Sequence, residues 1–223
     1  KHDFIFAHLN IGNTLKNLER FEDAIEAYNH ALSTAPQFID ALIGRGLAYH
    51  KLRRFDEAVG DFKHAITLDP KSGPAYLNCG VTFLDMNNVA EALTCLEQAK
   101  KLMPQSPEVH INLGNALQQN SNLEDAIKTF RDALALNPQS AQAWCNLGNA
   151  LREVGETEEA FSYFERALKQ APSFALAHYN KGIALAASNK TQEAVVAFNK
   201  AIEIDANYND PKFALASVLL LIG

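Results

Sequence analysis

The chain has 223 residues, of which 48% are hydrophobic and 21% are charged, as in ordinary folded proteins. This composition excludes an intrinsically disordered chain, and the most apolar stretch, Ala214 to Ile222, is too short to span a membrane. The net charge of −6 argues against a nucleic-acid-binding protein, which needs a basic surface.

The termini and the cysteines suggest where the chain works. No basic and apolar leader follows Lys1, so we expect no secretory signal. Cys79, Cys95 and Cys145 form no CxxC pair, which favours a reducing compartment and a cytoplasmic location. Because the sequence starts without Met and Gly223 falls in a predicted turn, we expect both ends to continue in a longer protein.

The dominant feature is a repeat with a period of 34 residues. Glycine recurs with this step at Gly12, Gly46, Gly80, Gly114, Gly148 and Gly182. Two alanine series, beginning at Ala24 and Ala31, and a proline series beginning at Pro36 keep the same step. If glycine is position 8, the repeats are 5–38, 39–72, 73–106, 107–140, 141–174 and 175–208, with a partial seventh at 209–223. Such a period predicts an array of stacked units.

Each repeat, taken in chain order, predicts two helices of about 14 residues. In repeat 141–174 the first helix carries Trp144, Leu147 and Leu151 on one face, and the second carries Ala160 and Phe164. A polar turn at 155–157 separates the helices, and the proline at 172 ends the second. The partial seventh repeat predicts one further helix, from about Pro211 to Leu221. Isolated helices of this length are marginal in water, so they must pack against neighbours.

The recurring small residues are interpreted as core. A glycine inside a helix costs about 1 kcal/mol relative to alanine, which is tolerable where it lets two helices approach closely. Position 24 supplies a large side chain to fill that space: Tyr28, Phe62, Leu96, Phe130, Phe164 and Phe198.

These residues resemble the tetratricopeptide repeat (TPR) family over 5–208 in full and 209–223 in part. The resemblance implies an all-α fold: one right-handed superhelical solenoid of antiparallel helix pairs over 1–223, with a concave groove lined by the first helix of each repeat. One departure is position 15, where the family favours glycine. Here it is Glu19, Arg53, Asn87, Ser121, Gly155 and Asn189.

No sequence pattern for catalysis or cofactor binding is found. The Gly44–Gly46 pair lacks the third glycine of a dinucleotide fingerprint, and no phosphate loop and no HExxH occur. His8, His110 and His178 share position 4, which is interpreted as packed against the neighbouring helix. A nucleophile, base and orienting group cannot be assembled. We therefore expect no catalytic site, no metal and no cofactor.

Asparagine recurs where the TPR resemblance places the groove. Position 6 is Asn10, Gly44, Asn78, Asn112, Asn146 and Asn180, and position 9 adds Asn13, Asn115 and Asn149. Asparagine is a mediocre helix former, and its amide matches a peptide bond because it both donates and accepts. We call these eight asparagines the asparagine row. It resembles the asparagine ladder in the TPR region of O-GlcNAc transferase, which implies contact with a peptide main chain. The alternative is that these amides bond neighbouring repeats.

Three functions remain open. The first is a non-enzymatic module that binds an extended peptide or a partner protein. The second is the substrate-presenting arm of a larger enzyme, such as a glycosyltransferase, and the third is a self-assembling scaffold. The carboxylate clamp of some TPR co-chaperones is not expected, because Leu9 and Pro74 stand where it needs lysines. An apolar face at Leu215, Val218, Leu219 and Ile222 predicts a homodimer through the last helix.

Overall fold

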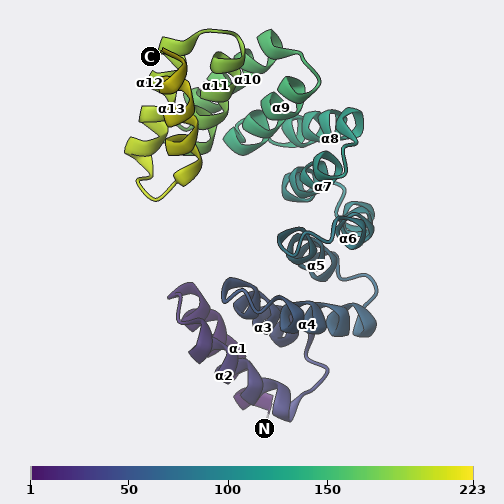
Figure 1. The fold of residues 1–223 in the computed structure, drawn as a ribbon. Helices are drawn as coiled ribbons and strands as arrows, with labels where there is room; N and C mark the ends of the chain where they lie inside the picture. Colours follow the sequence, from purple (N-terminus) through teal and green to yellow (C-terminus); the bar gives the residue numbers. More distant parts are fainter. Residues whose placement is uncertain (1, 223) are drawn as a thin grey trace. The chain divides into compact units, whose positions relative to one another are not determined.

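The structure, a computed structural model, describes residues 2–222, with side chains from Phe4 to Leu220. Within these residues it contains thirteen α-helices and no strand (Figure 1). The first helices of the pairs are α1 (His2–Asn17), α3 (Ile39–Lys51), α5 (Gly73–Asp85), α7 (Pro107–Gln119), α9 (Ala141–Glu153) and α11 (Ala175–Ala187). The second helices are α2 (Phe21–Thr34), α4 (Phe55–Leu68), α6 (Val89–Leu102), α8 (Leu123–Leu136), α10 (Thr157–Gln170) and α12 (Thr191–Ile204). The chain ends with α13 (Asn209–Ile222).

The predicted all-α repeat array is confirmed. From α3 to α11 each first helix has 13 residues, and every second helix from α2 to α12 has 14. From α1 to α12 each helix packs most extensively on its partner in the same repeat, and within each unit neighbouring repeats also contact one another. The helices therefore depend on stacking for stability, as their length requires.

The core is built from the predicted small and large residues. A Cβ atom added to Gly148 would lie 2.7 Å from Cε1 of Phe164, which is closer than a real contact allows. Gly12 stands in the same relation to Tyr28. All six large residues at position 24 are fully buried, as are the alanines at positions 20 and 27. The glycine of each repeat thus provides the hollow that the large side chain of the second helix fills.

The turn within each repeat has left-handed backbone geometry at position 15. Glu19, Arg53, Asn87, Ser121 and Asn189 have φ between 58° and 59°, and Gly155 has φ 92°. This region is strained for residues with a Cβ atom and unstrained for glycine. The departure from glycine thus keeps the turn in the left-handed region, with φ smaller than at Gly155, and adds strain to five of six copies.

The chain divides into two compact units, Lys1–Gln105 and Ser106–Gly223. Unit 1 holds α1 to α6, and unit 2 holds α7 to α13. The boundary falls at the end of the predicted repeat 73–106.

The last helix uses part of its apolar face inside unit 2. Val218 is buried, and Leu215 packs partly against the cluster that contains Phe198. Leu219 remains 51% exposed, and the side chain of Ile222 lies outside the described residues. The predicted open face is therefore smaller than the sequence suggests, because α12 covers half of it.

Candidate functional site

In each unit the first helices contact one another and form one surface, which we call the first-helix face. In unit 1 it consists of α1, α3 and α5, and in unit 2 of α7, α9, α11 and α13. The asparagine row lies on these helices as predicted. Asn10 is exposed and the other seven asparagines are half-buried. The leucines and isoleucines next to them at position 5 are mostly packed: Leu9, Leu77 and Ile111 are buried.

In unit 2 two asparagines bridge neighbouring repeats. Nδ2 of Asn146 donates to Oδ1 of Asn115 at 2.8 Å, across the contact between α9 and α7. Nδ2 of Asn180 donates to Sγ of Cys145 at 3.4 Å, across the contact between α11 and α9. Burial raises the pKa of Cys145 to about 11, so this sulfur accepts as a neutral thiol. The alternative interpretation, that the row joins repeats, therefore holds for these amides.

A polar cluster continues this face at the end of α9. Oε1 of Glu153 accepts from Nε2 of Gln118 at 2.8 Å and from Nδ2 of Asn149 at 3.1 Å. Nη2 of Arg152 donates to Oδ1 of Asn149 at 2.8 Å, while its Nε is buried without a partner among the described residues. Gln118 lies at the same position as Arg152, one repeat earlier, and belongs to the cluster although sequence analysis did not select it.

Two other members of the row turn back to their own helices. Nδ2 of Asn78 donates to the carbonyl of Pro74 at 2.9 Å, and Nδ2 of Asn112 donates to the carbonyl of Glu108 at 3.0 Å. These bonds, like the two bridges in unit 2, use one N–H of each amide. The second N–H and the side-chain oxygen of Asn78, Asn112, Asn146 and Asn180 have no partner among the side chains described, those of residues 4–220, or the backbone of 2–222.

Unit 1 interrupts the row at Gly44 because Tyr28 takes the space. A Cβ atom on Gly44 would lie 2.6 Å from Cζ of Tyr28 and 2.8 Å from its hydroxyl oxygen. That hydroxyl donates to Oδ1 of Asn13 at 2.8 Å, and burial raises the pKa of Tyr28 to about 12. Position 24 is phenylalanine or leucine in the other repeats, and each of these except the last precedes an asparagine at position 6. Tyrosine in one repeat is thus paired with glycine in the next.

An open groove of about 710 Å³ lies above this pair in unit 1. Its apolar lining includes Leu9, Phe38, Ile43, Leu47 and Pro74. Its polar lining includes Asn13, Lys16, Asp40 and Asp69. Burial lowers the pKa of Lys16, and no carboxylate among residues 4–220, whose side chains the structure describes, pairs with its ammonium group. The groove therefore combines an apolar floor with charged groups of both signs.

The structure also joins three residues that sequence analysis could not assemble. Nδ1 of His50 lies 2.9 Å from Oγ1 of Thr82, and its Nε2 lies 3.1 Å from Oδ2 of Asp85. The sequence interpretation missed this set because its members lie in two repeats, with His50 and Thr82 32 residues apart. Thr82 is fully buried, and its hydroxyl donates to the carbonyl of Asn78 at 2.7 Å. No substrate reaches this hydroxyl, so the set joins α3 to α5.

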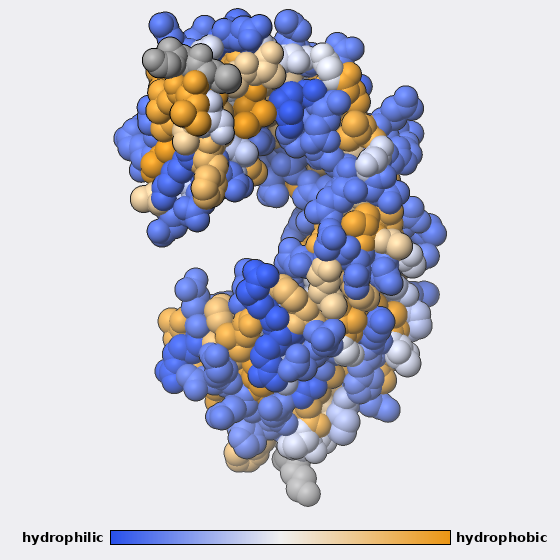
Figure 2. Space-filling view, in the orientation of Figure 1, coloured by the Kyte–Doolittle hydropathy of each residue, from blue (hydrophilic) through white to orange (hydrophobic). Residues whose placement is uncertain are grey.

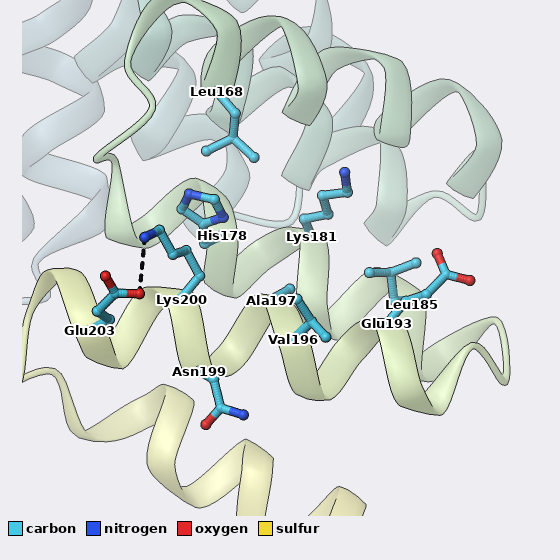
Figure 3. A pocket seen from close by; sticks show the side chains of 10 residues that line it. All are labelled: Leu168, His178, Lys181, Leu185, Glu193, Val196, Ala197, Asn199, Lys200 and Glu203. Carbon is cyan, nitrogen blue, oxygen red and sulfur yellow. Dashed lines mark hydrogen bonds and ion pairs between the residues drawn. The ribbon is translucent and has the colours of Figure 1, made fainter.

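A second cavity, of about 640 Å³, lies among α10, α11 and α12 in unit 2 (Figure 3). Leu168, Leu185 and Val196 line it, and Nζ of Lys200 is 2.9 Å from Oε2 of Glu203 at its edge. Lys181 is also paired, with Glu165 at 3.3 Å. Its cations are thus already neutralised within the protein, and the asparagine row does not reach it.

Two further findings on the described residues concern metal ions and membranes. No group of three or more His, Cys, Asp and Glu side chains among them is arranged to hold a metal ion. No helix within 2–222 has the length and hydropathy that crossing a membrane requires.

Solved structures with this fold come from several kinds of protein. A chain of the Cut9–Hcn1 hetero-tetramer of the APC/C superposes with a TM-score of 0.87 at 21% identity, covering 98% of this chain and 43% of that one. PilF of Pseudomonas aeruginosa gives a TM-score of 0.80 at 17% identity, covering 97% of this chain and 98% of that one. YrrB, described as a TPR protein with an unusual peptide-binding site, gives 0.63 at 23% identity, covering 85% and 98%. At these identities the likeness establishes the fold alone.

Sequence comparison points to one family. The search of curated proteins gives no match, and nothing in the comparisons supports the likeness to O-GlcNAc transferase. Two family models described as tetratricopeptide repeat match residues 9–73, 111–173 and 145–209, and residues 49–113. These matches cover most of the chain and agree with the helix pairs of the structure. The chain therefore belongs to the tetratricopeptide repeat family.

Proposed function

We propose that the first-helix faces bind an extended segment of a partner protein, with the asparagine row pairing with its main chain. The observation that carries the proposal is the incomplete hydrogen bonding of the row. Asn78, Asn112, Asn146 and Asn180 each spend one N–H inside the protein, which fixes the orientation of the amide. The remaining oxygen and N–H match the donor and acceptor of a peptide unit.

The fixed amides lower the entropic cost of binding. A side chain already held by a hydrogen bond loses little rotamer freedom when a ligand arrives. The helix that carries it is rigid, because its neighbours in the repeat bury the alanines and glycine around it. The described peptide-binding site of YrrB, whose fold this chain shares, adds support by analogy.

The test replaces Asn112 and Asn146 together by alanine. The probe is a displayed library of random peptides, from which binders to the unmodified protein are selected. The double variant should bind the selected peptides about 1–3 kcal/mol more weakly, because peptide groups are left unpaired. Exposed asparagines outside the row, Asn120 and Asn199, provide the matched alanine control.

Two results would contradict the proposal. One is a row variant that binds like the control variant. The other is a row variant whose melting temperature falls while its affinity is unchanged, since that would leave the bridge from Asn146 to Asn115 as the only role of these amides.

A second candidate function is self-association through α13. Phe213 is 72% exposed and Leu220 is 84% exposed, beside the half-exposed Leu219. Hydrophobic residues gather over this end of unit 2 in Figure 2. We propose a two-fold dimer, since a soluble monomer rarely leaves such a patch open. Light scattering should show a dimer that Leu219→Glu with Leu220→Glu converts to a monomer, and a monomer before substitution would reject it.

Two coarser proposals concern the setting of the chain. We propose a reducing, cytoplasmic location, supported by three free thiols of which Cys79 and Cys145 are buried. Thiol titration of protein isolated from its source under alkylating conditions would test it. The role of a substrate-presenting arm would be supported by a catalytic domain in the parent gene.

A further inference from the structure

We infer that the groove of unit 1 selects a partner segment by one bulky apolar side chain that has a carboxylate on one side and a cation on the other. This inference rests on the proposed function and names the class of segment for one part of the surface. It concerns the groove of about 710 Å³ above Tyr28 and Gly44.

The apolar part of the site follows from Gly44. In a repeat with asparagine at this position an amide would project from α3. Here glycine projects nothing, and Tyr28 closes the floor from below without being exposed. Leu9, Ile43 and Leu47 form the surrounding walls. A large apolar side chain of the partner is the group that gains most from leaving water in such a hollow.

The donor side of the site lies on α1. The hydroxyl of Tyr28 donates to Oδ1 of Asn13, so the amide of Asn13 turns its two N–H groups away from that bond. Lys16 stands one helical turn further along the same helix and also lines the groove. Its ammonium group has no carboxylate partner among the described side chains of residues 4–220. The N–H groups of Asn13 and the charged ammonium group of Lys16 are therefore donors that favour a carboxylate of the partner.

The acceptor side lies on α3 and at the end of α4. Asp40 stands in the first turn of α3, and Asp69 follows the last residue of α4. Both line the groove, and neither forms an ion pair with a described side chain between residues 4 and 220. Asp69 accepts from the backbone N–H of Lys71 at 2.9 Å, which leaves its charge uncompensated. A cation on this side of the apolar residue completes the charge complementarity.

The selection described above also tests this inference. Peptides that bind the full chain should share a bulky apolar residue with Asp or Glu on one side and Lys or Arg on the other. The charge reversal Lys16→Glu should weaken them roughly tenfold or more, as loss of a charge-assisted hydrogen bond does. Reversing the acidic residue of the peptide should restore binding to that variant. Lys101→Glu, an exposed change of the same charge on α6, is the matched control.

A second variant separates recognition from folding. Asn13→Asp keeps an oxygen for the hydroxyl of Tyr28 and removes the N–H donors from the groove. We expect an unchanged melting temperature and weaker binding of the acidic peptides.

The outcomes distinguish the two proposals. Peptides that bind the protein and respond alike to Lys16→Glu and Lys101→Glu would overturn the inference and leave the proposed function in place. Peptides that share the apolar residue without flanking charges would also overturn it. A selection that yields no binder would overturn both.

Discussion

The first-helix faces of the two units solve one packing problem in two ways. In unit 2 the residue at position 24 is phenylalanine in all three complete repeats. Where another complete repeat follows, its residue at position 6 is asparagine. These amides bridge the first helices, as from Asn146 to Asn115. In unit 1 Tyr28 extends through the place of the amide, and Gly44 makes room for it. One face is polar and cross-linked, and the other contains an apolar groove.

The difference shows that a buried residue can decide which side chain its neighbour carries. The ring of Tyr28 is fully buried, and its Cζ, Cε1 and hydroxyl oxygen together fill the space that a Cβ atom on Gly44 would need. A repeat can therefore change its exposed surface through a residue of its core.

Removing the large core residue in unit 2 should have the largest effect. Phe130→Ala should lower the free energy of unfolding by about 3–5 kcal/mol, because Phe130 is fully buried beside Gly114. Urea unfolding measured by circular dichroism gives this value. A loss below about 1 kcal/mol would mean that the neighbouring helices close the hollow unaided.

Replacing Gly44 by asparagine should destabilise the protein, and the loss should be smaller when Tyr28 is changed to phenylalanine as well. Gly44→Asn should cost about 1–3 kcal/mol through overpacking against Tyr28. Tyr28→Phe should cost about 0.5–1.5 kcal/mol for the bond to Asn13. The double variant recreates the pattern of unit 2, so it should cost less than the sum. Additive losses would refute the pairing, and Gly60→Asn, where a Cβ meets nothing within 4 Å, is the control.

Relieving the turn strain should stabilise unit 1 by a smaller amount. Glu19 has φ 58°, so Glu19→Gly should add about 1 kcal/mol to the free energy of unfolding. The reverse change in unit 2, Gly155→Glu, should remove a similar amount because Gly155 has φ 92°. Thermal unfolding of the two variants measures both effects. If both variants melted at the temperature of the unmodified protein, the proposed backbone strain would be contradicted.

The contact between α3 and α5 should make the stability of unit 1 depend on pH. Burial lowers the pKa of His50 below its usual 6.5, with Asp85 opposing this shift and Lys51 adding to it. Since the unfolded chain binds the proton more readily, stability is full above pH 6.5 and falls as pH decreases through the folded-state pKa. His50→Gln should flatten this decline in urea unfolding between neutral and acidic pH. A slope that the variant leaves unchanged would assign it to other groups.

Most of the fold could be predicted from the sequence because the recurring residues mark where each helix pair begins and ends. The step from Gly12 to Gly182 fixes where each pair begins, and the prolines fix where it ends. The burial of Phe164 against Gly148 follows from residue size alone. The covered half of α13 could not be predicted, because whether Leu215 meets α12 depends on how the helices are inclined.

The place of the asparagines on the first helices could be predicted from the sequence, but their hydrogen-bond partners could not. Periodicity placed the asparagines on the first helices, but side-chain rotamers decide which group an amide meets. Asn78 and Asn146 share a repeat position, yet one bonds its own helix and the other bridges two. In the sequence, Tyr28 and Gly44 appear as two separate departures from the repeat pattern. Only their distance in the structure joins them.

Within each unit, helices contact only neighbours that are one or two places away in the chain. Pulling on such a unit loads its helix pairs in series, because no long-range contact shares the force between distant repeats. The pairs should therefore yield separately under tension, each releasing a similar length of chain. A unit built in this way can extend stepwise and recover from either end.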